Sequence, residues 1–150
     1  MIPIRRIVVG FDGSADGARA VRWAAAHAAQ QHAVLEVVYS YDYPYLERLG
    51  AETRARLHDD AVAVADAGVR LAREVDTDVE VRAVVEVGEP GRVLVARAEG
   101  ADLLVVGHQG ANRAHHRMLG SVAVRCVHHA PCSVFVLRDS GDVAGVPVPD

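Results

Sequence analysis

Apolar residues along this chain follow two periods, which predict alternating strands and helices. Continuous or alternating apolar runs predict strands over 6–11, 33–39, 79–86, 103–106 and 133–137. Apolar residues that recur every three or four positions predict helices over 15–31, 51–74, 90–99 and 119–129. Strands and helices that alternate within one chain predict an α/β fold with an open, doubly wound parallel sheet and helices on both faces.

In such a sheet, ligands bind beyond the carboxyl ends of the strands, at the point where the strand order reverses. Asp12 directly follows the first predicted strand, and Ser14 is a suitable N-cap for the helix that comes next. Gly107 directly follows the fourth predicted strand and opens a loop that reaches residue 121. If these two strands flank the point of reversal, Asp12 and the loop over 107–121 face each other across one crevice.

The fifth strand is apolar along its length, although the chain order places it at an edge of the sheet. It consists of Ser133, Val134, Phe135, Val136 and Leu137. A bare apolar edge strand is prone to aggregation, and pairing with a second copy of the chain would cover it. We therefore expect a homodimer that forms through this strand.

Length and composition indicate one globular domain over 1–139, followed by a flexible tail over 140–150 that contains glycine and proline. No stretch reaches the ~20 apolar residues that span a bilayer, and the first apolar run is too short for a signal peptide. We therefore expect a soluble protein of the cytoplasm. The two cysteines, Cys126 and Cys132, are too few for a disulfide framework or a zinc site and are expected to be core residues.

The charged residues exclude several classes of protein. A formal net charge of −4 argues against a general nucleic-acid-binding protein, and no lysine is present among the sixteen basic residues. Without lysine, the chain has no Walker A loop, no Schiff-base lysine for pyridoxal phosphate and no kinase strand lysine. Residues 103–138 contain no acidic residue but carry four arginines and five of the eight histidines, which favours polyanion binding. Pairing of basic side chains with a helix C-terminus explains only part of this bias.

A strand, a glycine-rich loop and the start of a helix follow one another from Leu103 onward. Gly107 and Gly110 come directly after the strand, and Gly120-Ser121 begins the last helix. This arrangement presents backbone N–H groups to a phosphate. Ser121 is a suitable N-cap and a suitable phosphate ligand, and the two roles are compatible. Asp12 is interpreted as a ligand of Mg²⁺ or of a ribose, the alternative being a turn carboxylate.

The spacing Gly107-x-x-Gly110, nine residues and Gly120-Ser121 resembles the G-2x-G-9x-G-(S/T) signature of the ATP-binding branch of the universal stress protein family. The similarity extends over about 4–138 and includes 7–14, 88–90, 100–107 and 128–134. It implies a Rossmann-like, adenine nucleotide alpha hydrolase-like sheet in the order 3-2-1-4-5. It also implies dimerisation through the last strand, and ATP with Mg²⁺ bound against the first, second and fourth strands.

The resemblance also implies which residues contact the nucleotide. The matching positions are Gly10, Phe11, Asp12, Ser40, Val106, Gly107, Gly110, Arg113, Gly120, Ser121 and Val122. Two features depart from the family pattern and bear on affinity and base selectivity. Ser40 stands at the adenine-facing position, which is usually small and apolar, and His115-His116 lies in the spacer, where a solvated loop is expected rather than a metal site.

Three functions fit this sequence. The first is an ATP-binding regulatory module of the stress response, in which nucleotide occupancy changes the partner interactions of a dimer. The second is a nucleotide-independent dimeric chaperone or adaptor. The third is a weak ATPase, for which the spacing of the residues provides no nucleophile–base pair and no general base, so any hydrolysis is expected to be slow.

Overall fold

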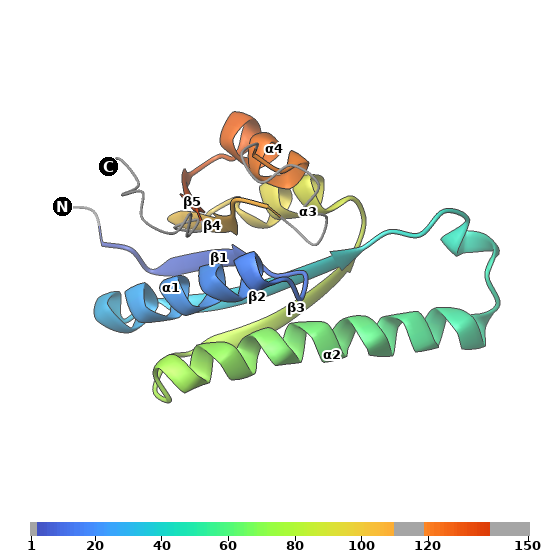
Figure 1. Cartoon of the computed structure of the whole chain (residues 1–150), viewed down its shortest axis with the longest axis horizontal. Helices are drawn as coiled ribbons and strands as arrows, with labels where there is room; N and C mark the ends of the chain where they lie inside the picture. Colours follow the sequence, from blue (N-terminus) through green and yellow to red (C-terminus); the bar gives the residue numbers. More distant parts are fainter. Residues whose placement is uncertain (1–2, 110–118, 139–150) are drawn as a thin grey trace, which may run out of the picture.

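The computed structural model describes residues 3–109 and 119–138. The strands are β1 (Arg6–Gly10), β2 (Val34–Tyr41), β3 (Val81–Val87), β4 (Leu103–Gly107) and β5 (Ser133–Leu137). The helices are α1 (Ala15–Gln31), α2 (Ala51–Val75), α3 (Pro90–Arg97), α4 (Ser121–His129) and the short 3-10 helix η1 (Leu46–Arg48) (Figure 1). The predicted positions Gly110, Arg113 and His115-His116 and the predicted tail over 140–150 lie outside the described residues.

The five strands form one sheet in the order β3-β2-β1-β4-β5, and every neighbouring pair is parallel. In the register of the sheet, Val8 pairs with Glu36 of β2 and with Leu104 of β4. The strand order reverses between β1 and β4, which are adjacent in the sheet although α1, β2, α2, β3 and α3 separate them in the sequence. The predicted doubly wound parallel sheet is therefore confirmed, including its strand order.

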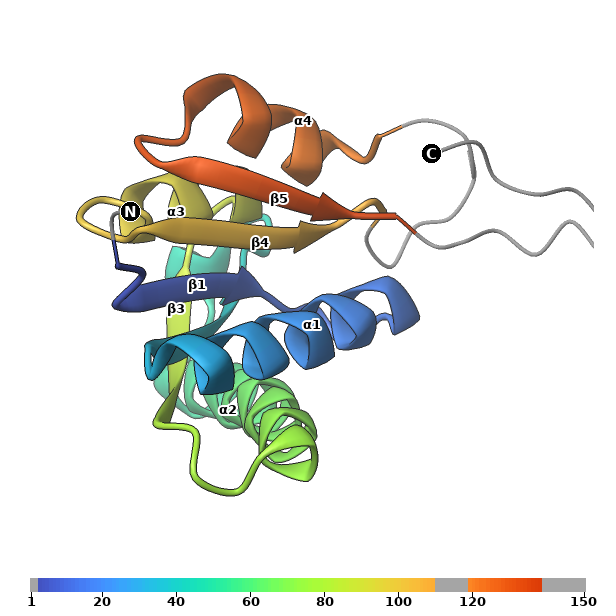
Figure 2. The ribbon, with the colours of Figure 1, turned by 90° about the vertical axis from the view of Figure 1, so that its left-hand side faces the viewer.

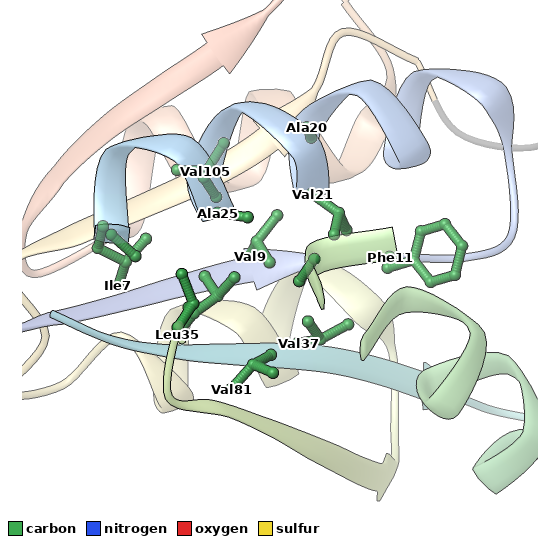
Figure 3. Close-up of a cluster of buried hydrophobic side chains, with 14 of the residues drawn as sticks. Ile7, Val9, Phe11, Ala20, Val21, Ala25, Leu35, Val37, Val81 and Val105 are labelled. Carbon is green, nitrogen blue, oxygen red and sulfur yellow. The ribbon is translucent and has the colours of Figure 1, made fainter. Parts of the chain in front are cut away.

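Helices cover both faces of the sheet, α1 and α2 on one and α3 and α4 on the other (Figure 2). Side chains of a strand alternate between the two faces, so Ile7 and Val9 pack under α1 while Val8 packs toward α3. Figure 3 shows the first of these cores, in which Val21 and the small side chains of Ala20 and Ala25 bring α1 close to the strands. Alanine suits this position because it lets a helix backbone approach the sheet.

Most element boundaries differ from the prediction by one or two residues; for example, β3 begins at Val81 and α4 at Ser121 rather than at residues 79 and 119. β2 continues through Tyr41, which pairs with Val87, so the first residues of the predicted loop belong to the sheet. The apolar side chains of β3 are not all on one buried face, because Ala83 is exposed and Val84 packs against the α3 side. α3 ends at Arg97 rather than at residue 99.

β5 contacts α1 through a pair of stacked aromatic rings. The rings of Trp23 and Phe135 lie with their centroids 3.9 Å apart and an interplanar angle of 6°. Cys126 is buried in the second core, as predicted, whereas Cys132 is only half-buried. None of the helices described is long and apolar enough to cross a membrane.

Candidate functional site

A cleft of about 280 Å³ opens at the carboxyl ends of β1, β2 and β4, where the strand order reverses. Nine of the eleven predicted site residues line it: Gly10, Phe11, Asp12, Ser40, Val106, Gly107, Gly120, Ser121 and Val122. The other two, Gly110 and Arg113, lie outside the described residues. Asp12 and the two ends of the glycine loop therefore share one crevice, as the switch-point argument predicted.

The turn between β1 and α1 forms one wall of the cleft. Gly13 has a φ of 86°, which glycine adopts without strain, and this turns the chain from the strand into the helix. Oδ1 of Asp12 accepts a hydrogen bond from the N–H of Ser14 at 2.9 Å, and Oγ of Ser14 accepts one from the N–H of Gly17 at 3.0 Å. The predicted N-cap at Ser14 is confirmed. The interaction with Ser14 shows that Asp12 is in part a turn carboxylate, although it also faces the cleft.

The two ends of the glycine loop are joined by backbone hydrogen bonds. His108 donates its N–H to the carbonyl oxygen of Leu137 at 2.9 Å, and its own carbonyl accepts from the N–H of Gly120 at 2.8 Å. The first hydrogen bond ties the loop to the end of β5, and the second ties the start of α4 to the end of β4. The glycine loop therefore begins and ends at one fixed point beside the cleft.

Asp16 is a buried carboxylate behind the loop that the sequence did not identify. It is 5% exposed, and its Oδ2 accepts a hydrogen bond from the N–H of Gln109 at 3.3 Å. Its Oδ1 pairs with Nη2 of Arg19 at 3.1 Å, one turn further along α1. A Cβ on Gly107 would lie 3.0 Å from the carbonyl carbon of Asp16, so glycine at this position permits close packing of α1. Asp16 thus positions the loop from the side opposite the cleft.

The N-terminus of α4 forms a polar part of the cleft. The N-cap is Gly120 rather than Ser121, and Ser121 is the first residue of the helix. The interpretation of Ser121 as an N-cap is therefore wrong; Ser121 is exposed and lines the cleft at the helix start. The first turn of α4 contains no acidic residue. Its backbone N–H groups and the positive end of the helix dipole favour an anion at this helix start.

Much of the remaining wall of the cleft is apolar. It includes Val38, Leu94 and Val106, all buried, and Ser40 on β2. Tyr39 also lines the cleft; burial raises the pKa of its phenol, and the nearby Tyr43 and Asp12 add to this effect. The cleft thus combines an apolar wall suited to a flat ring system with a polar helix start suited to an anion.

The sequence also missed two polar residues that the loop buries. His108 and Gln109 line the cleft and are 5% and 7% exposed. Both follow the last strand residue in a glycine-rich stretch, where polar side chains are normally interpreted as solvated. The only available signal was that they continue β4, whose unbroken apolar run indicates a strand buried on both faces.

Among the described residues that line the cleft, Asp12 is the one carboxylate that could bind a divalent cation. Within 3–109 and 119–138, no group of three or more histidine, cysteine, aspartate or glutamate residues is arranged to hold a metal. Mg²⁺ is usually bound by one or two carboxylates together with ligand phosphates and water, so Asp12 alone is compatible with a nucleotide-borne Mg²⁺.

The parallel sheet and the cleft at its switch point define a doubly wound, Rossmann-like α/β protein. The sequence model of the universal stress protein family matches residues 3–138, and the chain belongs to this family. A putative universal stress protein of Staphylococcus epidermidis is 31% identical over 152 residues, which cover 92% of this chain and 86% of the relative.

Solved structures agree with this assignment. A universal stress protein in complex with cAMP is 27% identical, with a TM-score of 0.71 and coverage of 91% of this chain and 98% of that one. The universal stress protein UspA from Lactobacillus plantarum is 26% identical, with a TM-score of 0.75 and coverage of 92% and 100%.

Proposed function

We propose that this chain binds ATP in the switch-point cleft and acts as a dimeric regulatory module of the stress response. The observation that carries the proposal is that one cleft gathers Asp12 from the β1–α1 turn, Ser40 from β2, Gly107 from β4 and Ser121 from α4. A relative whose structure was solved with cAMP supports an adenine nucleotide as the ligand. An ATP ligand also fits the cytoplasmic location that we propose.

The two kinds of surface in the cleft set the orientation of the nucleotide. The base lies against the apolar wall formed by Val38, Leu94 and Val106, where its burial is favourable. The phosphates lie against the first turn of α4, where the N–H groups and the hydroxyl of Ser121 donate to the anionic oxygens. Asp12 supplies one oxygen to a Mg²⁺ ion that the phosphates hold. This arrangement makes both ends of the ligand contribute to affinity.

The proposed dimer forms through the outer edge of β5. The carbonyl of Leu137 accepts from His108 on the inner side, and backbone groups alternate in direction along a strand, so Val136 directs its N–H and C=O outward. Among the described residues, no strand pairs with that edge. The hydrogen bond between His108 and Leu137 also joins the cleft loop to β5. This bond supports the proposal that nucleotide occupancy alters the dimer surface and thereby the choice of partner.

Nucleotide binding is tested first on the freshly purified protein. Denaturation should release ATP, identified by mass spectrometry, and titration calorimetry of nucleotide-free protein should detect ATP binding. Ser121→Asp should weaken ATP binding at least tenfold, because the new carboxylate repels the phosphates while it suits the start of a helix. Thr77→Asp places the same charge on the exposed turn between α2 and β3, outside the lining of the cleft, and should leave the affinity unchanged. Absence of binding by the wild type, or equal affinities for the two variants, would refute the proposal.

Dimer formation is tested by light scattering coupled to size-exclusion chromatography. Val136→Pro removes an outward N–H from β5 and should yield monomers. Ala83→Pro is the matched control, because it removes an outward N–H from β3 at the other edge of the sheet, and should leave the dimer intact. A dimer that survives Val136→Pro would exclude this edge as the interface.

A further inference from the structure

The hydroxyl of Ser40 is a polar group without a partner in the wall of the cleft. Ser40 lies in β2, paired with Glu86 of β3, and is half-buried. Its Oγ is buried, and it makes no hydrogen bond with any other described atom. Buried hydroxyls are normally hydrogen-bonded because leaving one unpaired costs stability. An unpaired hydroxyl in the wall of a cleft therefore points to a ligand that supplies the missing hydrogen bond.

The surroundings of Ser40 explain why the protein does not satisfy this group. Val38 lies two residues earlier on the same face of β2, and its carbonyl already accepts from the N–H of Phe11 at 3.0 Å. Leu94 and Val106, which line the same cleft, have apolar side chains and offer no hydrogen-bond partner. Rotation of the serine side chain by about 120° between staggered positions redirects the hydroxyl without moving the strand.

We propose that the Ser40 hydroxyl hydrogen-bonds to the polar edge of the purine base that lies against the apolar wall of the cleft. This inference rests on the proposed function and assigns a role to a side chain where an apolar residue would pack equally well. A hydroxyl both donates and accepts, so it can pair with a ring nitrogen or with an exocyclic amine. In the ligand-free protein the same group is a source of instability.

The proposal predicts opposite effects of one substitution on stability and on binding. Ser40→Ala should raise the melting temperature of the ligand-free protein by about 2–4 °C, because it removes an unpaired polar group. The same change should weaken ATP binding by about tenfold, through the loss of one hydrogen bond. The affinity for inorganic triphosphate should not change, because that ligand lacks a base. Thr77→Ala, at an exposed hydroxyl outside both the cleft and β5, should change none of these quantities.

A matched pair of larger side chains isolates the hydroxyl from the effect of volume. Ser40→Thr and Ser40→Val introduce side chains of nearly equal size, both suited to a strand, and only threonine retains the hydroxyl. The threonine variant should bind ATP more tightly than the valine variant, by about tenfold in calorimetry.

Equal ATP affinities for wild type and Ser40→Ala, or for the threonine and valine variants, would overturn the proposal while leaving the proposed function standing. A melting temperature that falls in Ser40→Ala would also overturn it, because the hydroxyl would then have a partner within the protein. Absence of ATP binding by the wild type would overturn the proposed function, and this assignment with it.

Discussion

We expect Glu36→Gln to destabilise the fold, because Glu36 is buried between two arginines. Its side chain accepts from Nε of Arg6 at 2.7 Å, from Nη2 of Arg6 at 3.1 Å and from Nη2 of Arg97 at 3.3 Å. Arg6 also donates to the carbonyls of Arg97 and Glu99 at the end of α3, at 2.9 and 3.1 Å. The carboxylate therefore holds two guanidinium groups between the sheet and α3.

The size of the effect follows from burial. Glu36 is 6% exposed, and removing one partner of a buried ion pair costs about 3–5 kcal/mol, since the remaining charges lose their compensation. The side chains of Arg6 and Arg97 are 28% and 33% exposed, so water screens them in part. We therefore expect a loss near the lower end of that range, about 3 kcal/mol in the free energy of unfolding.

The same carboxylate makes stability depend on pH. The hydrogen bond from Arg6 lowers the pKa of Glu36 in the folded protein, against the opposing effect of burial, and the charges of Arg6 and Arg97 lower it further. A group whose pKa is lowered by folding stabilises the protein above its unfolded pKa and loses this contribution as pH falls through its folded pKa. The difference between wild type and Glu36→Gln should be constant from pH 7 down to about 4.5, the ordinary value for glutamate, and shrink below it.

Urea unfolding followed by circular dichroism measures both effects. The matched control is Glu80→Gln, whose partner Arg82 lies at a similar distance of 2.8 Å but in a pair whose side chains are both 62% exposed. It should change stability by no more than about 0.5 kcal/mol. Equal losses for the two variants would refute the argument that burial sets the magnitude. ATP affinity should be the same in both, because the Glu36 network lies toward the amino end of β1, away from the cleft.

Three further predictions concern packing around the cleft. Gly107→Ala should lower the free energy of unfolding by about 1–3 kcal/mol because its Cβ would meet the backbone of Asp16, and an unchanged urea midpoint would contradict this. Phe135→Ala should shift the fluorescence of Trp23, the sole tryptophan, and cost about 2 kcal/mol; an unshifted spectrum would exclude the stack in solution. Burial raises the pKa of the Cys126 thiol to about 11, so an aromatic disulfide reagent at pH 8 should label it only after unfolding, as mass spectrometry would show.

The ends of strands were predicted most accurately where a buried apolar run is bounded by glycine or proline. The apolar runs of β1, β4 and β5 are bounded by glycine or proline, and their predicted ends lie within one residue of the observed ones. β2 was predicted too short because Ser40 and Tyr41 precede a stretch that contains proline and reads as a loop. Parallel pairing of Tyr41 with Val87 keeps these residues in the sheet, and a contact between distant segments leaves no local pattern in the sequence.

Only part of the site was predicted, because the rest depends on contacts between distant segments of the chain. Glycine spacing located the loop and the helix start, since it reflects local backbone geometry. The roles of Asp16, His108 and Gln109 depend on how α1 packs behind the loop, across a sequence separation of 93 residues for the Asp16–Gln109 hydrogen bond. An acidic residue in the first turn of a helix is normally interpreted as a solvated partner of the helix dipole. For this reason Asp16 was not predicted to be a buried carboxylate of the site.

Two glycines of the cleft also have close packing neighbours, which changes how the nucleotide site should be tested. A Cβ on Gly10 would lie 2.7 Å from Cδ1 of Leu94, the end of a side chain that can move, whereas one on Gly107 would press on the backbone of α1. Glycine at position 107 therefore serves the approach of α1, with or without a ligand. Substituting these glycines would disturb packing as well as binding and could not separate the two. Ser121 is exposed at the helix start and the Ser40 hydroxyl makes no hydrogen bond within the described chain, so changes in these side chains report on the ligand itself.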